Sequence, residues 1–78
     1  KNAQLDKAYV ESLCAKGIKE IKKKVTEEAG ETSISAVSND GRVIDESADL
    51  VLHLLVLLNE LGFKMRDVMN ELIKRSSN

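Results

Sequence analysis

The sequence predicts an all-α fold from three observations. The chain of 78 residues contains no proline. Gly17, Gly41 and Gly62 divide it into four segments of helix-forming composition, as expected where glycine marks a helix end or a turn. Apolar residues in these segments recur at helical spacing, and no stretch alternates for long enough to build a sheet. We therefore expect one all-α domain over residues 1–78, with helices at about 3–15, 18–37, 42–61 and 65–74.

The second and third helices are predicted to form an antiparallel hairpin. Residues 38–41 between them read Ser-Asn-Asp-Gly. All four residue types favour turns, through side-chain hydrogen bonds to the backbone or tolerance of positive φ. The third helix should therefore fold back along the second, whose apolar stripe includes Ile21, Val25 and Ala29.

The third helix predicts a homodimer. Residues 50–58 are apolar almost all round the helix, interrupted only by His53. A surface helix needs a single apolar stripe, so this one should be covered on several sides. A chain this short buries a small share of its surface, and oligomerisation is a usual remedy. We therefore expect a helical-bundle homodimer packed through the third helix.

Composition excludes several classes of protein. The net charge is −1 and Tyr9 and Phe63 are the only aromatic residues, so there is neither a basic field nor a stacking platform for nucleic acid. No apolar run reaches the length of a membrane span, and Cys14 is the only cysteine. We interpret Cys14 as a small buried hydrophobe rather than a reactive thiol, and we expect a soluble, cytoplasmic protein.

Five acidic residues mark a candidate metal site. Three lie in the second helix and two early in the third: Glu27, Glu28, Glu31, Glu46 and Asp49. Residues three or four apart share a helix face. Glu28 and Glu31 lie seven to ten positions before the turn, and Glu46 and Asp49 five to eight after it, so the two pairs reach comparable heights in a hairpin. An all-oxygen set favours magnesium, manganese or calcium over zinc. The alternative is a solvated charged face paired with lysines.

Nearby residues extend this hypothesis. Lys23 and Lys24 precede the glutamates and could reach metal-bound phosphates, whereas Lys22 is better explained as part of a solvated face. His53 follows Asp49 by four residues, and either a satisfied core histidine or a residue that orients substrate or a carboxylate would fit. A di-iron bundle site is excluded, since glutamate and histidine three apart are absent from both helices.

The chain resembles the phosphoribosyl-ATP pyrophosphohydrolase family of the all-α nucleotide pyrophosphohydrolase superfamily. The resemblance rests on the stretch Lys-Lys-Val-Thr-Glu-Glu-Ala-Gly-Glu at 23–31 and on residues 46–58, and it covers nearly the whole chain. The sequence departs from the usual family residues at four positions, where members have glycine, an aromatic residue, serine and often a basic residue: Thr26, Leu52, Ala8 and Glu20.

The resemblance implies a function. It implies magnesium-dependent hydrolysis of phosphoribosyl-ATP to phosphoribosyl-AMP and pyrophosphate, in histidine biosynthesis, by a cytoplasmic homodimer. It also implies roles for particular side chains. Lys23 and Lys24 would bind the phosphates. Glu27 would have one of three roles: it would hydrogen-bond the metal ligands without touching the metal, bind a second metal, or act as the base that deprotonates water. The implied metal ligands are Glu28, Glu31, Glu46 and Asp49.

Two other functions stay open at this point. A housecleaning pyrophosphohydrolase acting on free nucleoside triphosphates would share the metal motif but tolerate a changed base and ribose pocket. A non-catalytic helical dimer would carry the same acids as surface charge only.

Overall fold

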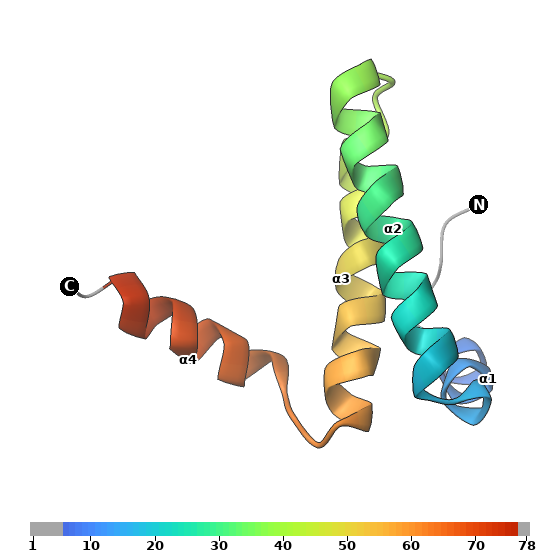
Figure 1. Cartoon of the computed structure of the whole chain (residues 1–78), viewed down its shortest axis with the longest axis vertical. Helices are drawn as coiled ribbons and strands as arrows, with labels where there is room; N and C mark the ends of the chain where they lie inside the picture. The colour runs from blue at the N-terminus through green and yellow to red at the C-terminus, as the bar shows by residue number, and fades with distance from the viewer. Residues whose placement is uncertain (1–5, 77–78) are drawn as a thin grey trace.

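The computed structural model describes residues 6–76 (Figure 1). Within that range the chain forms four α-helices and no strand: α1 (Lys7–Lys16), α2 (Ile18–Ser38), α3 (Val43–Glu60) and α4 (Met65–Ser76). The predicted all-α class is confirmed, and the four helices fall where the sequence placed them to within a few residues. None of the described helices is both long and apolar enough to cross a membrane.

The turn at residues 38–41 forms the predicted hairpin. Asn39 adopts the left-handed conformation, with φ 55° and ψ 46°, and its N–H donates to the carbonyl of Ser35 at 3.0 Å. The Asp40 carboxylate accepts from the hydroxyl of buried Ser35 at 2.5 Å and from the N–H of Arg42 at 2.9 Å. These bonds tie the end of α2 to the start of α3, so the two helices run antiparallel side by side (Figure 1).

The first helix begins later than the sequence predicted. Asp6 has extended backbone angles, and its side chain accepts the N–H of Tyr9 at 2.8 Å. An aspartate that caps a helix in this way stands outside it, so α1 begins at Lys7. The predicted helical residues 3–5 lie outside the described range. Gly17, at φ 91°, then separates α1 from α2.

A small core joins the first three helices. Leu13, Ile21 and Val56 are buried together, one from each helix. Cys14 is half-buried against this cluster, and burial first, then Glu60, raises the pKa of its thiol. Cys14 therefore lies where a small hydrophobe is expected. Leu52 of α3 is also buried.

The fourth helix leaves the hairpin. The backbone turns at Gly62, with φ 87°, and α4 then projects away from α2 and α3 (Figure 1). None of its residues is buried, although one face is apolar. That face, called here the α4 apolar face, consists of half-buried and exposed side chains: Met65, Val68, Met69 and Leu72. The described part of one chain thus leaves this face uncovered.

Candidate metal and phosphate site

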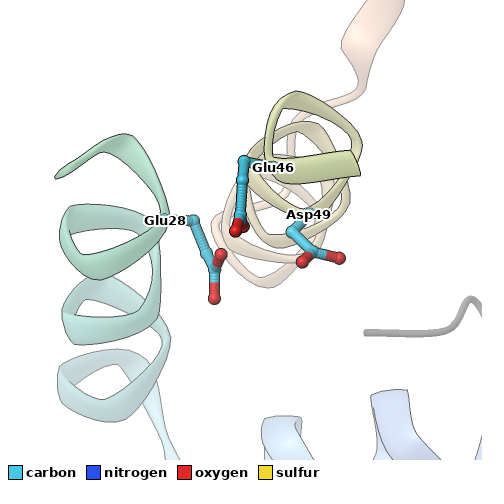
Figure 2. Close-up of side chains that lie close together, drawn as sticks. All are labelled: Glu28, Glu46 and Asp49. Carbon is cyan, nitrogen blue, oxygen red and sulfur yellow. The ribbon is translucent and has the colours of Figure 1, made fainter. Parts of the chain in front are cut away.

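Three carboxylates from both arms of the hairpin converge. Glu28 comes from α2, and Glu46 and Asp49 come from the first two turns of α3 (Figure 2). One oxygen from each lies within 4.8 Å of the others. A single ion bound between them could therefore contact all three. The hairpin turn produces this meeting, because it sets the acid-bearing turns of two antiparallel helices at the same height.

These carboxylates are poorly hydrated. The exposed fraction of Asp49 is only 5%, and the buried Oε1 atom of Glu28 has no hydrogen-bond partner among residues 6–76. Burial raises the pKa of Glu28, and the negative charges of Glu31 and Asp49 raise it further. A buried, unpaired carboxylate oxygen beside other carboxylates is costly unless a cation or a proton neutralises it.

The residues present fit a divalent cation that prefers oxygen. All three donors are carboxylates, and no histidine or cysteine joins the group. Magnesium binds one or a few carboxylates and completes its octahedron with water or phosphate oxygens, and manganese accepts the same donors. Three protein ligands on one side would leave coordination positions open for substrate.

Glu31 and Glu27 lie beside this group rather than in it. Glu31 is exposed, although its charge is close enough to raise the pKa of Glu28. Residues three apart differ by about 60° around a helix, so with Glu28 aimed between the helices Glu31 turns toward solvent. Glu27 pairs with Lys24, with 3.7 Å between its Oε1 and the lysine Nζ. Lys23 is exposed on the same helix.

His53 has protein partners at both ring nitrogens. Its exposed fraction is 1%, Nδ1 lies 2.6 Å from the carbonyl oxygen of Asp49, and Nε2 lies 2.6 Å from the hydroxyl of Tyr9. A carbonyl only accepts, so Nδ1 donates to it, and in the neutral imidazole the Tyr9 hydroxyl then donates to Nε2. This arrangement favours the satisfied core histidine over a residue that contacts substrate. No pattern in the sequence indicated that Tyr9 would contact His53, which is 44 positions away.

A second residue that sequence reasoning missed is Arg42. Its Nη2 and Nε atoms lie 3.2 Å and 3.4 Å from Oε2 of Glu46. The four-residue spacing of Arg42 and Glu46 was the available signal, because such pairs are neighbours on a helix. A guanidinium therefore stands at the edge of the acid group.

The geometry defines an all-α protein whose helical hairpin brings three carboxylates together between its two arms. Residues 1–76 match the family described as phosphoribosyl-ATP pyrophosphohydrolase. The chain belongs to this family.

Similar proteins agree with this assignment. A phosphoribosyl-ATP pyrophosphatase of Sinorhizobium medicae is 44% identical over 73 residues, which cover 92% of this chain and 68% of that protein. One of Pyrobaculum aerophilum is 46% identical over 69 residues, covering 87% and 73%. A histidine biosynthesis bifunctional protein HisIE of Vibrio vulnificus is 47% identical over 76 residues, covering 96% and 36%. The chain thus spans about a third of the bifunctional relatives. No solved structure matches it significantly.

Proposed function

We propose that this chain carries out magnesium-dependent hydrolysis of phosphoribosyl-ATP to phosphoribosyl-AMP and pyrophosphate, a step of histidine biosynthesis, in the cytoplasm. One observation carries the proposal. The oxygens of Glu28, Glu46 and Asp49 converge within 4.8 Å in a chain of the phosphoribosyl-ATP pyrophosphohydrolase family. Such a site suits a diphosphate linkage, since phosphoryl transfer depends mainly on positioning and on neutralising charge.

In this proposal the carboxylates hold the metal and the lysines hold phosphate oxygens. A bound magnesium or manganese ion would neutralise phosphate charge and lower the pKa of its bound water. Glu28, Glu46 and Asp49 would be its ligands, and Glu31 would join them from the next turn of α2. Glu27 would take the proton of the attacking water. A new bond would form between the water oxygen and a phosphorus of the diphosphate linkage. The bond from that phosphorus to the bridging oxygen would break, which would separate phosphoribosyl-AMP from pyrophosphate.

The lysines would act on the phosphates. Lys24 is half-buried one turn before Glu28 and pairs with Glu27, so its ammonium group already lies beside the acids. Lys23 is more exposed and would contact phosphate only at the rim. His53, buried against Tyr9, would contribute by holding the middle of α3 in register with α1 rather than by touching the phosphates.

We also propose that the working form is a homodimer. Only four hydrophobic side chains are buried among the described residues, a small core for four helices: Leu13, Ile21, Leu52 and Val56. The α4 apolar face and Val51 of α3 remain open to solvent in one chain. A second copy packed on these surfaces would remove apolar area from water, at about 25 cal/mol per Å².

Release of pyrophosphate tests the catalytic proposal. Purified protein with magnesium is given phosphoribosyl-ATP, with deoxynucleoside triphosphates in parallel. We expect pyrophosphate from phosphoribosyl-ATP. Release from the deoxynucleotides alone would instead support the housecleaning enzyme, and no release by folded protein would support the non-catalytic dimer.

Two variants make this test specific. Glu28→Gln removes a ligand charge at almost constant volume, so turnover should fall at least about 100-fold, more than loss of a group that merely supports a ligand. Glu11→Gln is the matched control, because Glu11 is an exposed glutamate on α1 that pairs only at 3.9 Å with Lys7. Its turnover should equal that of the unmodified protein.

A further inference from the structure

Arg42 lies at the edge of the acid group formed by Glu28, Glu46 and Asp49. It is the residue before the first turn of α3, and its guanidinium reaches Oε2 of Glu46 through two nitrogens. The exposed fraction of the Arg42 side chain is 46%, against 12% for Glu46. The arginine is therefore the more exposed partner, and it contacts the Glu46 carboxylate from the solvent side.

The backbone of Arg42 is held in position. Its N–H donates to Asp40, which also accepts from Ser35 near the end of α2. Both hydrogen bonds lower the pKa of Asp40, Ser35 contributing most, so the carboxylate stays charged near neutral pH. The turn therefore fixes the backbone position from which the Arg42 side chain extends toward Glu46.

A second arginine shows what an ordinary pair of this kind looks like. Arg75 binds Glu71 on α4 at 3.0 Å with the same spacing of four residues, and both side chains are largely exposed, at 73% and 49%. Such surface pairs contribute little to stability. The carboxylate bound by Arg42 differs because it belongs to the group that would hold a cation. An ion bound there would weaken the attraction between Glu46 and the guanidinium.

Arg42 and Lys24 lie at opposite ends of the acid group. Lys24 is four residues before Glu28 on α2, and Arg42 is four residues before Glu46 on α3. Because the helices are antiparallel, Lys24 lies on the side of the acid group away from the turn and Arg42 on the side near the turn. Along the helix axis, each is about 6 Å from the glutamate that it precedes. A row of phosphates laid across the metal would meet a positive side chain at each end.

We propose that Arg42 is a phosphate-binding residue of this site, paired with Glu46 when no substrate is present and transferred to phosphate oxygens when metal and substrate bind. The planar guanidinium offers parallel N–H groups that match two oxygens of one phosphate, which an ammonium cannot do. This role for Arg42 extends the proposed function and rests on it, because both require a divalent cation among the three carboxylates.

Two binding titrations test this role without turnover. The first measures Mn²⁺ alone, and the second measures inorganic pyrophosphate in the presence of saturating Mn²⁺, both by calorimetry. We expect Arg42→Gln to weaken pyrophosphate binding about tenfold or more, the usual range for a hydrogen bond to a charged group. Mn²⁺ alone should bind as well as before or more tightly, since Glu46 loses a competing cation. Arg42→Lys should recover only part of the pyrophosphate affinity.

Arg75→Gln is the matched control and should change neither titration. Weaker Mn²⁺ binding by Arg42→Gln would mean that the arginine merely supports Glu46, and it would overturn the proposal. Unchanged pyrophosphate affinity, or an unmodified protein that binds no Mn²⁺, would overturn it as well. Turnover separates this inference from the proposed function. If the protein hydrolyses phosphoribosyl-ATP but Arg42→Gln leaves pyrophosphate binding unchanged, only the inference about Arg42 is wrong. If Arg42→Gln weakens pyrophosphate binding but the unmodified protein hydrolyses no phosphoribosyl-ATP, only the proposed function is wrong.

Discussion

The α2–α3 hairpin and α4 both carry amphipathic patterns, but they use their apolar residues differently. The hairpin buries Ile21, Leu52 and Val56 and brings three carboxylates together beside them. The α4 helix buries nothing and stands away from the hairpin (Figure 1). We infer that the hairpin contains its own site within one chain, whereas α4 is shaped for a surface that another chain supplies. This division predicts which variants affect which property.

The largest effect on stability should come from the hairpin core. Ile21 is fully buried, so Ile21→Ala should lower the free energy of unfolding by about 2 to 5 kcal/mol through lost transfer energy and a cavity. Chemical denaturation measures this change. Ile44→Ala is the control, because Ile44 is 77% exposed and should change stability by less than about 0.5 kcal/mol. Equal losses at the two positions would contradict the packing described here.

The next effect concerns the metal. Asp49→Asn removes a charge from the acid group, and we expect Mn²⁺ affinity to fall at least about 100-fold by calorimetric titration. Asp45→Asn provides the comparison on the same helix, since Asp45 is exposed and lies outside the group. That variant should bind Mn²⁺ within about twofold of the unmodified protein. If both variants lost affinity alike, general negative charge rather than a defined site would attract the ion.

A smaller effect is expected when the α4 apolar face is changed. Leu72→Arg places a charge in the face, so the dissociation constant of the proposed homodimer should rise about tenfold or more, as judged by sedimentation at several concentrations. Helical content by circular dichroism should not change, because Leu72 is already exposed in a single chain. Asn70→Arg adds the same charge on the other side of α4 and should leave the dimer intact. A dimer unaffected by Leu72→Arg would assign α4 another role.

The smallest effect is a dependence on pH. The pKa of Glu28 is raised in the folded protein, mainly by burial, so the folded state prefers its protonated form. The stability that this preference contributes is full below the ordinary pKa of 4.5 and is lost as pH rises through the folded pKa. Metal-free Glu28→Gln should therefore become increasingly more stable than the unmodified protein as pH rises toward neutrality.

Thermal unfolding at a series of pH values, with and without Mg²⁺, measures that difference. Added Mg²⁺ should stabilise the unmodified protein and not the variant, because an ion that binds only the folded state shifts the folding equilibrium. A difference between the two proteins that stays constant with pH would contradict the burial described for Glu28.

Local features made the hairpin predictable. The Ser-Asn-Asp-Gly turn identifies the reversal from residue chemistry alone, and counting residues from the turn places Glu28 level with Glu46 and Asp49. The same counting could not show that Glu31 lies beside the converging oxygens of Glu28, Glu46 and Asp49 rather than among them. Residues three apart share a face only loosely, and whether the second one points inward depends on how each helix is rotated about its axis.

Features that depend on distant packing were not predictable. Tyr9 and His53 meet because α1 crosses near α3, and no spacing in the sequence encodes that crossing. The direction of α4 depends on the backbone angles at Gly62. Glycine can adopt many backbone conformations, so the sequence alone does not determine the direction of the helix. The cap at Asp6 could have been read from the sequence, since aspartate is a preferred residue at that position.

We expect the two arms of the hairpin to hold one ion between them. The anomalous scattering of Mn²⁺ in a crystal grown or soaked with that ion would locate it. We predict a peak within bonding distance of carboxylate oxygens from Glu28, Glu46 and Asp49, at about 2.0 to 2.2 Å. A crystal with Mn²⁺ bound elsewhere, or with the three carboxylates turned apart and no ion between them, would contradict the account.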